Sequence, residues 1–225
     1  MKEKSEHVIE LHGLSAKTMS ILLDCIYSEK FMFSIENVQE ILPAAALLQL
    51  TDILIGCEQF LKNQLDPHNC LGIMKFAEIH DCKNLKNATQ EYIYEHFSHI
   101  VQNSDEFLQL KPHELEELIQ SNEIEVANEQ TVYNCVIKWI NVDKAEREKC
   151  LSDILQHVRL PLLSPQFLTD VCDQEVMIKK SFICRDMLDD AKKFYLRPDC
   201  HAEMNESRYK IRTGKELIFQ TLYLA

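Results

Sequence analysis

The chain has 225 residues, of which 46% are hydrophobic and 27% are charged, and this balance predicts a globular protein with a sizeable core. Its four glycines are too few and too scattered for the turns of a β-barrel or propeller, or for the glycine-rich loops of nucleotide sites. A net charge of −12 opposes the phosphate backbone, so nucleic acid is not an expected partner.

Helical periodicity runs through most of the chain. Ser15 is placed to cap a helix with an apolar stripe at Met19, Leu22, Leu23 and Ile26. Two more stripes span residues 38–48 and 54–65, and Pro43 should kink the first of them or start a new segment there. Further helices are predicted at residues 70–80, 83–101, 112–120, 129–140, 145–158, 165–172 and 183–196, with caps at Asn128 and Ser164.

Strand signals are few. Residues 7–11 and 31–33 show partial alternation of apolar and polar side chains. Two short strands cannot form a stable sheet by themselves, so they are either additions to a helical protein or parts of a sheet completed elsewhere.

The character of the chain changes after Pro198. Residues 199–215 are polar and include Arg208, Lys210, Arg212 and Lys215, a pattern typical of a solvated linker. The last residues, ELIFQTLYLA, are apolar and resemble a strand.

Nine cysteines without a C-x-x-C pair predict reduced, mostly buried thiols, as in proteins of the cytoplasm or nucleus. The first ten residues, MKEKSEHVIE, contain no apolar signal region. The longest apolar run, residues 41–48, is far shorter than a membrane span. We therefore expect a cytoplasmic or nuclear location and no membrane partner.

No set of residues points to catalysis. His96 and His99 share a helix face, but a zinc site would need further ligands from elsewhere. The chain lacks G-x-S-x-G and H-E-x-x-H motifs, and its carboxylate pairs fall on polar helix faces. We expect no catalytic residue, no metal and no cofactor, and arrays of amphipathic helix pairs usually serve as binding scaffolds.

Several segments together resemble the kelch-like family of BTB–BACK–kelch proteins. NVQEILPAAALLQL is similar to the late helices of a BTB domain, and LDPHNCLGIMKFAEIHDC is similar to the entry into a BACK domain. DEFLQL, VIKWI, VRLPLLSPQFL and CRDMLDDAKKFYLRP follow in the family's order, so the resemblance covers about residues 1–198.

The resemblance implies a mainly α fold in three parts. Residues 1–65 would form a partial BTB/POZ domain with helices and two short strands, and residues 66–198 an all-helical BACK domain of stacked helix pairs. Residues 199–225 would be a linker and the start of a kelch region, in which GKELIFQ is similar to a first propeller strand. Compared with the family, the chain looks shortened at both ends, with the first half of BTB and the propeller absent.

The family pattern also implies a partner. Kelch-like proteins are non-catalytic substrate adaptors of cullin-3-type ubiquitin ligases. Carried over by position, Met1 and Glu3 match a hydrophobic-x-Glu motif at the cullin contact, and Tyr27 resembles an aromatic residue beside it. Ile73 and Phe76 of the first BACK helix pair are expected to add apolar contact. Dimerisation with itself or with a related chain is expected to be impaired, and Leu22 and Leu23 to be exposed.

Two alternatives stay open. The chain could be a binding module that no longer engages cullin, acting as a competitor or existing as an inactive by-product. It could instead be a helical hydrolase or metal protein, a reading that the missing motifs disfavour.

Overall fold

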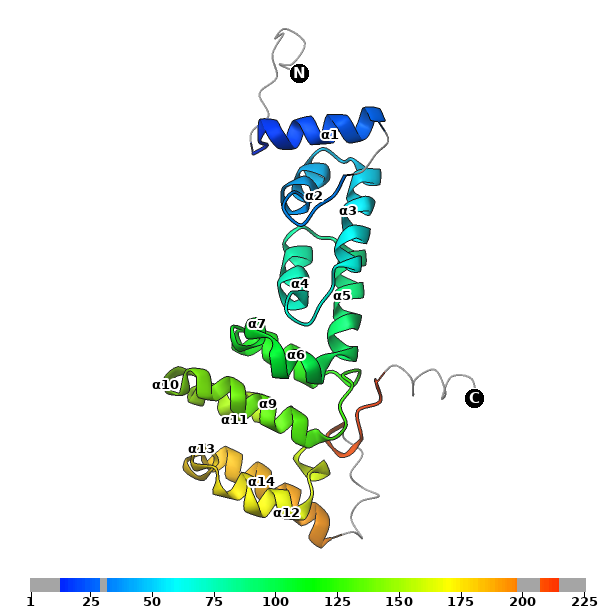
Figure 1. Ribbon diagram of the computed structural model, residues 1–225. Coiled ribbons are helices and arrows are strands. Elements are labelled where there is room, and N and C mark those ends of the chain that lie inside the picture. The colour runs from blue at the N-terminus through cyan, green and yellow to red at the C-terminus, as the bar shows by residue number, and fades with distance from the viewer. Residues whose placement is uncertain (1–12, 29–31, 198–206, 215–225) are drawn as a thin grey trace, which may run out of the picture. The chain divides into compact units, whose positions relative to one another are not determined.

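The computed structural model describes residues 13–28, 32–197 and 207–214, and within these ranges its secondary structure is helical. The described residues divide into two compact units. The first unit holds the described residues up to Asp66 together with Gly72–Thr89, and the second holds Pro67–Leu71 and the described residues from Gln90 onwards. The mainly α fold expected from the sequence is confirmed (Figure 1).

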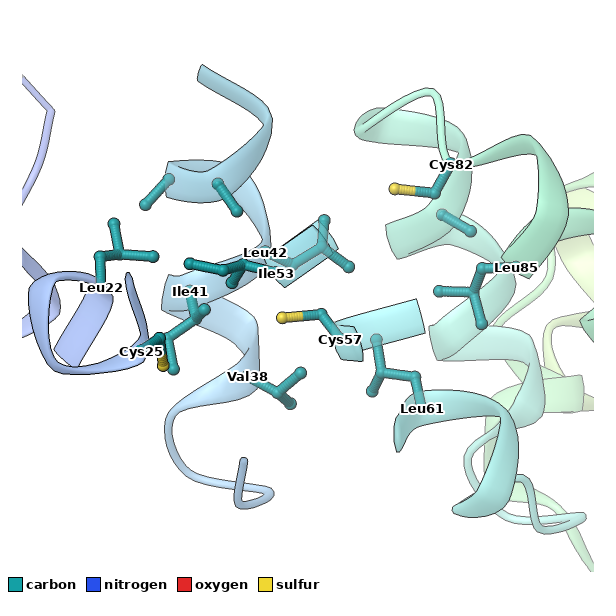
Figure 2. Close-up of a cluster of buried hydrophobic side chains, with 13 residues drawn as sticks. Leu22, Cys25, Val38, Ile41, Leu42, Ile53, Cys57, Leu61, Cys82 and Leu85 are labelled. Carbon is teal, nitrogen blue, oxygen red and sulfur yellow. The ribbon is translucent and has the colours of Figure 1, made fainter. Parts of the chain in front are cut away.

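A single hydrophobic cluster organises the first unit. Its helices are α1 (Ala16–Ser28), α2 (Val38–Leu47), α3 (Thr51–Asn63), most of α4 (Cys70–Ile79) and the first part of α5 (Lys83–Glu95). Figure 2 shows Leu22 of α1 facing Ile41 and Leu42 of α2, with Cys57 of α3 on the other side of α2. Each of these four side chains is fully buried, so α2 is the centre of the unit.

The second unit is a stack of helix pairs, as the BACK resemblance implied. In Figure 1 its helices lie in successive layers, from α6 and α7 through α9 and α11 to α12, α13 and α14. The helices are α6 (Phe97–Asn103), α7 (Asp105–Leu108), α8 (Pro112–Gln120), α9 (Glu129–Val142), α10 (Lys144–Arg147), α11 (Leu151–Leu155), α12 (Pro165–Asp170), α13 (Val176–Lys180) and α14 (Phe182–Leu196).

Helix α9 is the central element of this stack. Its Tyr133, Val136 and Trp139 side chains are buried. The indole N–H of Trp139 donates to the Leu110 carbonyl at 2.9 Å, which joins α9 to the segment before α8. The guanidinium of Arg147 lies 4.1 Å from the centre of the Trp139 ring and donates to the Trp139 carbonyl at 2.8 Å. The only tryptophan of the chain is therefore held by hydrogen bonds of its indole and carbonyl groups and by a cation over its ring.

The three predicted helix caps are confirmed. The hydroxyl of Ser15 accepts from the Thr18 N–H at 3.0 Å, at the start of α1. The Asn128 side chain accepts from Thr131 at the start of α9, and Ser164 accepts from Phe167 at the start of α12. Each cap satisfies one of the amide groups that the first helical turn leaves without an intrahelical partner.

The single helix predicted over residues 83–101 is wrong. Helix α5 ends at Glu95 and α6 begins at Phe97, with His96 between them. The His96 imidazole Nδ1 lies 3.0 Å from the Tyr92 carbonyl oxygen, and its ring stacks on Tyr92. Its own carbonyl accepts from the amides of His99 and Ile100, which starts the new helix. The His96 N–H still donates to the Tyr92 carbonyl at 3.0 Å, so the two helices follow each other directly with one turn residue between them.

One of the two effects expected at Pro43, a new helical segment, and the helix predicted over residues 145–158 both need correction. Helix α2 runs through Pro43 without starting again there, because buried neighbours such as Leu42 and Ala44 hold both halves against the core. The helix predicted over residues 145–158 is divided into α10, a 3₁₀ turn and α11. Helix α10 has no buried residue, whereas Leu151, Ile154 and Leu155 of α11 are buried. Packing against the core therefore stabilises α11 but not α10.

The strand predictions are not supported where the structure describes them. Residues 7–11 lie outside the described residues. Met32 and Phe33 belong to no strand, and the Phe33 ring packs 6.2 Å from that of Phe60. The Asn37 side chain donates to the Met32 carbonyl at 2.9 Å and accepts from the Ser34 amide at 2.8 Å. Backbone groups of this segment are thus satisfied without a neighbouring strand.

The predicted solvated linker is wrong for one of its cations. Arg208, Lys210 and Arg212 fall in the described residues 207–214, and Lys215 lies outside them. Lys210 is exposed, as expected, but the whole Arg212 residue is only 6% exposed. Its charge is compensated by a buried carboxylate of the second unit.

Candidate protein-interaction surface

Helix α1 separates its apolar side chains onto two faces. Leu22 and Cys25 are buried in the core of the first unit (Figure 2). Leu23, Ile26 and Tyr27, spaced as i, i+3 and i+4, form the opposite stripe and are 43%, 48% and 85% exposed. The expected exposure is therefore confirmed for Leu23 and wrong for Leu22, because α2 covers the inner face of α1. We call Leu23, Ile26 and Tyr27 the α1 stripe.

Hydrogen bonds hold α1 in this orientation. The Thr18 hydroxyl donates to a carboxylate oxygen of Glu40 at 2.7 Å, which joins the first turn of α1 to α2. The Ser15 cap lies beside the same threonine, with 2.7 Å between the two hydroxyl oxygens. The stripe therefore stands on a helix that both polar and apolar contacts fix to the core.

The segment between α1 and α2 adds two exposed apolar side chains. Met32 is 78% exposed and Ile35 is 68% exposed. The Asn37 hydrogen bonds to residues 32 and 34 fix the backbone that presents them. Sequence reasoning missed both residues because it assigned the start of this segment to a strand; the turn chemistry of Ser34 and Asn37 was the available signal.

Ile73 and Phe76 lie on α4, against the core of the first unit. Both side chains are partly buried, and the Phe76 ring meets the His80 ring edge-on at 4.6 Å. In Figure 1, α2 and α3 lie between α1 and α4. The structure therefore does not bring Ile73 and Phe76 together with Tyr27 in one patch.

Met1 and Glu3 lie outside the described residues. Their place in a contact surface stays a prediction carried by the resemblance. Of the five residues expected at the cullin contact, Tyr27 is the one whose side chain stands most fully in solvent among those described.

The thiols of the described residues carry no sign of nucleophilic chemistry. Eight cysteines are free, and all except the half-buried Cys150 are buried. Burial raises the pKa of Cys57 to about 12, and the nearby Cys25 and Cys82 thiols add to this rise. Burial also raises the pKa of Cys82 and of Cys172 to about 11. A nucleophilic cysteine needs the opposite shift, so these thiols act as small apolar core residues.

The two histidines considered as metal ligands, His96 and His99, have other contacts in the structure. His96 is engaged with Tyr92, and both His96 and His99 line a cavity of about 770 Å³ in the second unit. Within the described ranges, no group of three or more histidine, cysteine or acidic side chains is arranged to hold a metal ion.

Comparison with protein families agrees with this reading of an interaction scaffold. The model of the BTB/POZ domain matches residues 1–65, and the model of BACK, described as "BTB And C-terminal Kelch", matches residues 70–173. Both domains are protein-interaction modules. Among the described helices, none is long and apolar enough to cross a membrane. Two family models matched in this order over most of its length show that the chain belongs to the BTB–BACK family of proteins.

Proposed function

We propose that this chain is a non-catalytic adaptor subunit of a cullin-3-type ubiquitin ligase and that the α1 stripe contacts the cullin scaffold. The observation that carries the proposal is Tyr27, an aromatic side chain 85% exposed on a helix whose other face is fixed in the core. Exposed aromatic residues on rigid elements are the usual anchors of protein interfaces.

The surroundings of Tyr27 support an anchor role. Leu23 lies one turn before Tyr27 and Ile26 directly precedes it, so an approaching partner would cover three exposed apolar side chains of one helix. Their exposed side chains leave apolar surface in contact with water, and burying that surface against a partner would favour binding. The BTB and BACK matches support the choice of a cullin as the partner, because these two domains together are typical of cullin-3 ligase adaptors.

The test is isothermal titration calorimetry of the purified chain with the N-terminal domain of cullin-3. We expect the wild-type chain to bind and Tyr27→Ala to raise the Kd by about tenfold or more, because a central aromatic anchor contributes about 2 kcal/mol. Phe182→Ala is the matched control, since Phe182 is an aromatic residue 69% exposed on α14 of the second unit.

The outcomes separate the open alternatives. Equal binding by Tyr27→Ala and the wild-type chain would remove the α1 stripe from the contact. No binding by a wild-type chain with helical circular dichroism would contradict the adaptor proposal and favour a module that does not engage cullin. Met1→Ala, Glu3→Ala, Ile73→Ala and Phe76→Ala, titrated in the same way, test the other four residues that the resemblance assigns to the contact.

A further inference from the structure

Residues 207–214, which we call the C-terminal clasp, return to the helices of the second unit after α14. In Figure 1 the clasp, coloured orange-red, runs beside the segment that enters α9. Its Tyr209 ring stacks on Phe194 of α14 with 5.4 Å between ring centres. The Thr213 N–H donates to the Asn122 carbonyl at 3.0 Å, before α9. Contacts therefore hold both ends of the clasp.

The centre of the clasp is a buried ion pair. Arg212 meets Glu129, the first residue of α9, through two parallel hydrogen bonds of 2.9 and 2.8 Å. The two side chains are only 2% and 3% exposed. Removing two charges from water is unfavourable unless their geometry is good and their other polar atoms are also bonded.

Arg212 meets that condition. Its Nη1 group donates to the carbonyls of Ile119 and Ser121, and its Nη2 group donates to the carbonyl of His157 at 3.0 Å in addition to Glu129. With the Nε bond to Glu129, all five guanidinium N–H groups have a partner. The acceptors come from the end of α8, from the start of α9 and from the chain after α11, so one side chain ties three segments together.

A second arginine, Arg159, is bonded both to Glu129 and to the clasp. The Arg159 backbone N–H donates to Glu129 at 2.9 Å, and its guanidinium donates to the Lys210 carbonyl at 2.6 Å and to the Asn122 side chain. Glu129 thus accepts from a main-chain amide as well as from Arg212. The side chain of Lys210 is exposed, but its backbone carbonyl is bonded to the guanidinium of Arg159.

Gly214, the last residue of the clasp, occupies a position that suits glycine alone. Gly214 has a φ of +53°, a conformation that side chains of L-residues rarely adopt. A Cβ added there would lie 3.0 Å from the Cγ atom of Glu125. A residue other than glycine would push this carboxylate aside.

We infer that the clasp is an integral part of the folded second unit, locked by Arg212 and Glu129, so that this unit extends past α14 and includes residues 207–214. The lock lies well beyond residue 173, where the match to the BACK model ends.

Amide hydrogen exchange of the full chain, read at the Thr213 N–H, tests this inference. We expect Thr213 to be protected in the wild-type chain, and Arg212→Met to speed its exchange by about 100-fold, because a buried unpaired carboxylate is left behind. Lys210→Met removes the same charge two residues earlier from an exposed side chain and should leave the protection unchanged. Equal exchange in the two variants, or exchange of wild-type Thr213 at the rate of an unstructured peptide, would overturn the inference.

Arg212→Lys decides the question if Arg212→Met does not fold. Lysine keeps the positive charge but cannot reproduce the five directed hydrogen bonds of the guanidinium. We expect a faster exchange of Thr213, by about tenfold, while amides in the middle of α9 keep wild-type protection. Wild-type protection of Thr213 in Arg212→Lys would show that the guanidinium does not lock the clasp.

Discussion

Several cationic side chains of the second unit connect backbone segments. Arg147 donates to the carbonyls of Leu108 and Trp139, and Lys138 donates to the Val101 carbonyl near the end of α6 at 2.6 Å. The last carbonyls of a helix lack intrahelical partners, so a long cation that reaches them replaces lost water contacts. In a short-helix stack such helix ends are numerous, which gives these residues a structural role that a net charge does not reveal.

The buried thiols predict that the fold weakens at alkaline pH. Burial raises the pKa of Cys57 from the ordinary thiol value near 9 to about 12, so above pH 9 the unfolded chain releases this proton while the folded chain keeps it. The free energy of unfolding contributed by this thiol is therefore fully present below pH 9 and falls as the pH rises toward 12. We expect a loss of about 1.4 kcal/mol per pH unit from Cys57, measured by urea denaturation between pH 9 and 11 under reducing conditions.

Cys57→Ala should remove this contribution and make the dependence on pH less steep, while the contributions of Cys82 and Cys172 remain. Cys150→Ala, at the half-buried cysteine, controls for the removal of a thiol as such. The expectation fails if the two substitutions change the slope equally.

At the scale of single helices, two prolines illustrate how position decides the effect of one residue type. Pro165 is the first residue of α12, where its fixed φ suits the helix and its missing N–H costs nothing. Pro43 lies inside α2 and removes one hydrogen bond of the ladder. Packing of Ile41, Leu42 and Ala45 in the core offsets this loss, so α2 continues past Pro43 to Leu47.

Replacing these prolines should have opposite results. Pro43→Ala restores the missing amide donor and should stabilise the first unit by about 1–3 kcal/mol, measured by thermal circular dichroism. Pro165→Ala is the matched control and should be neutral or slightly destabilising. A lower melting temperature for Pro43→Ala would show that the ring contributes packing that outweighs the hydrogen bond.

At the scale of the whole molecule, the division into two compact units predicts unfolding that is not a single step. Trp139, the only tryptophan, lies in the second unit and is fully buried, so its fluorescence reports on that unit. Far-ultraviolet circular dichroism reports on the helices of both units. We expect the two signals to give different midpoints in urea.

Leu22→Ala locates the source of that difference. Leu22 is fully buried in the first unit, and its truncation should cost about 2–5 kcal/mol. We expect part of the circular dichroism transition to move to lower urea while the Trp139 fluorescence midpoint stays in place. Coincident transitions that move together in this variant would mean that the two units unfold as one.

Much of the secondary structure could be predicted because its causes are local. Helix α8 begins and ends where the pattern placed it, and α4, α9 and α14 differ from prediction by one or two residues. At Ser15, Asn128 and Ser164 the capping side chain accepts a hydrogen bond from the amide N–H three residues later, so each cap depends on local sequence alone. The family resemblance added the order of the two domains, which no periodicity contains.

The amino-acid sequence by itself thus determined a helical protein, its caps and its family, while the tertiary structure decided which polar and apolar groups are buried. Leu22 and Leu23 are equivalent by composition, and only the position of α2 covers one of them. Arg212 reads as a linker cation until Glu129, 83 residues earlier, is placed beside it. Local patterns carry no information on such pairings, because burial is set by chain segments that meet only when the whole unit folds.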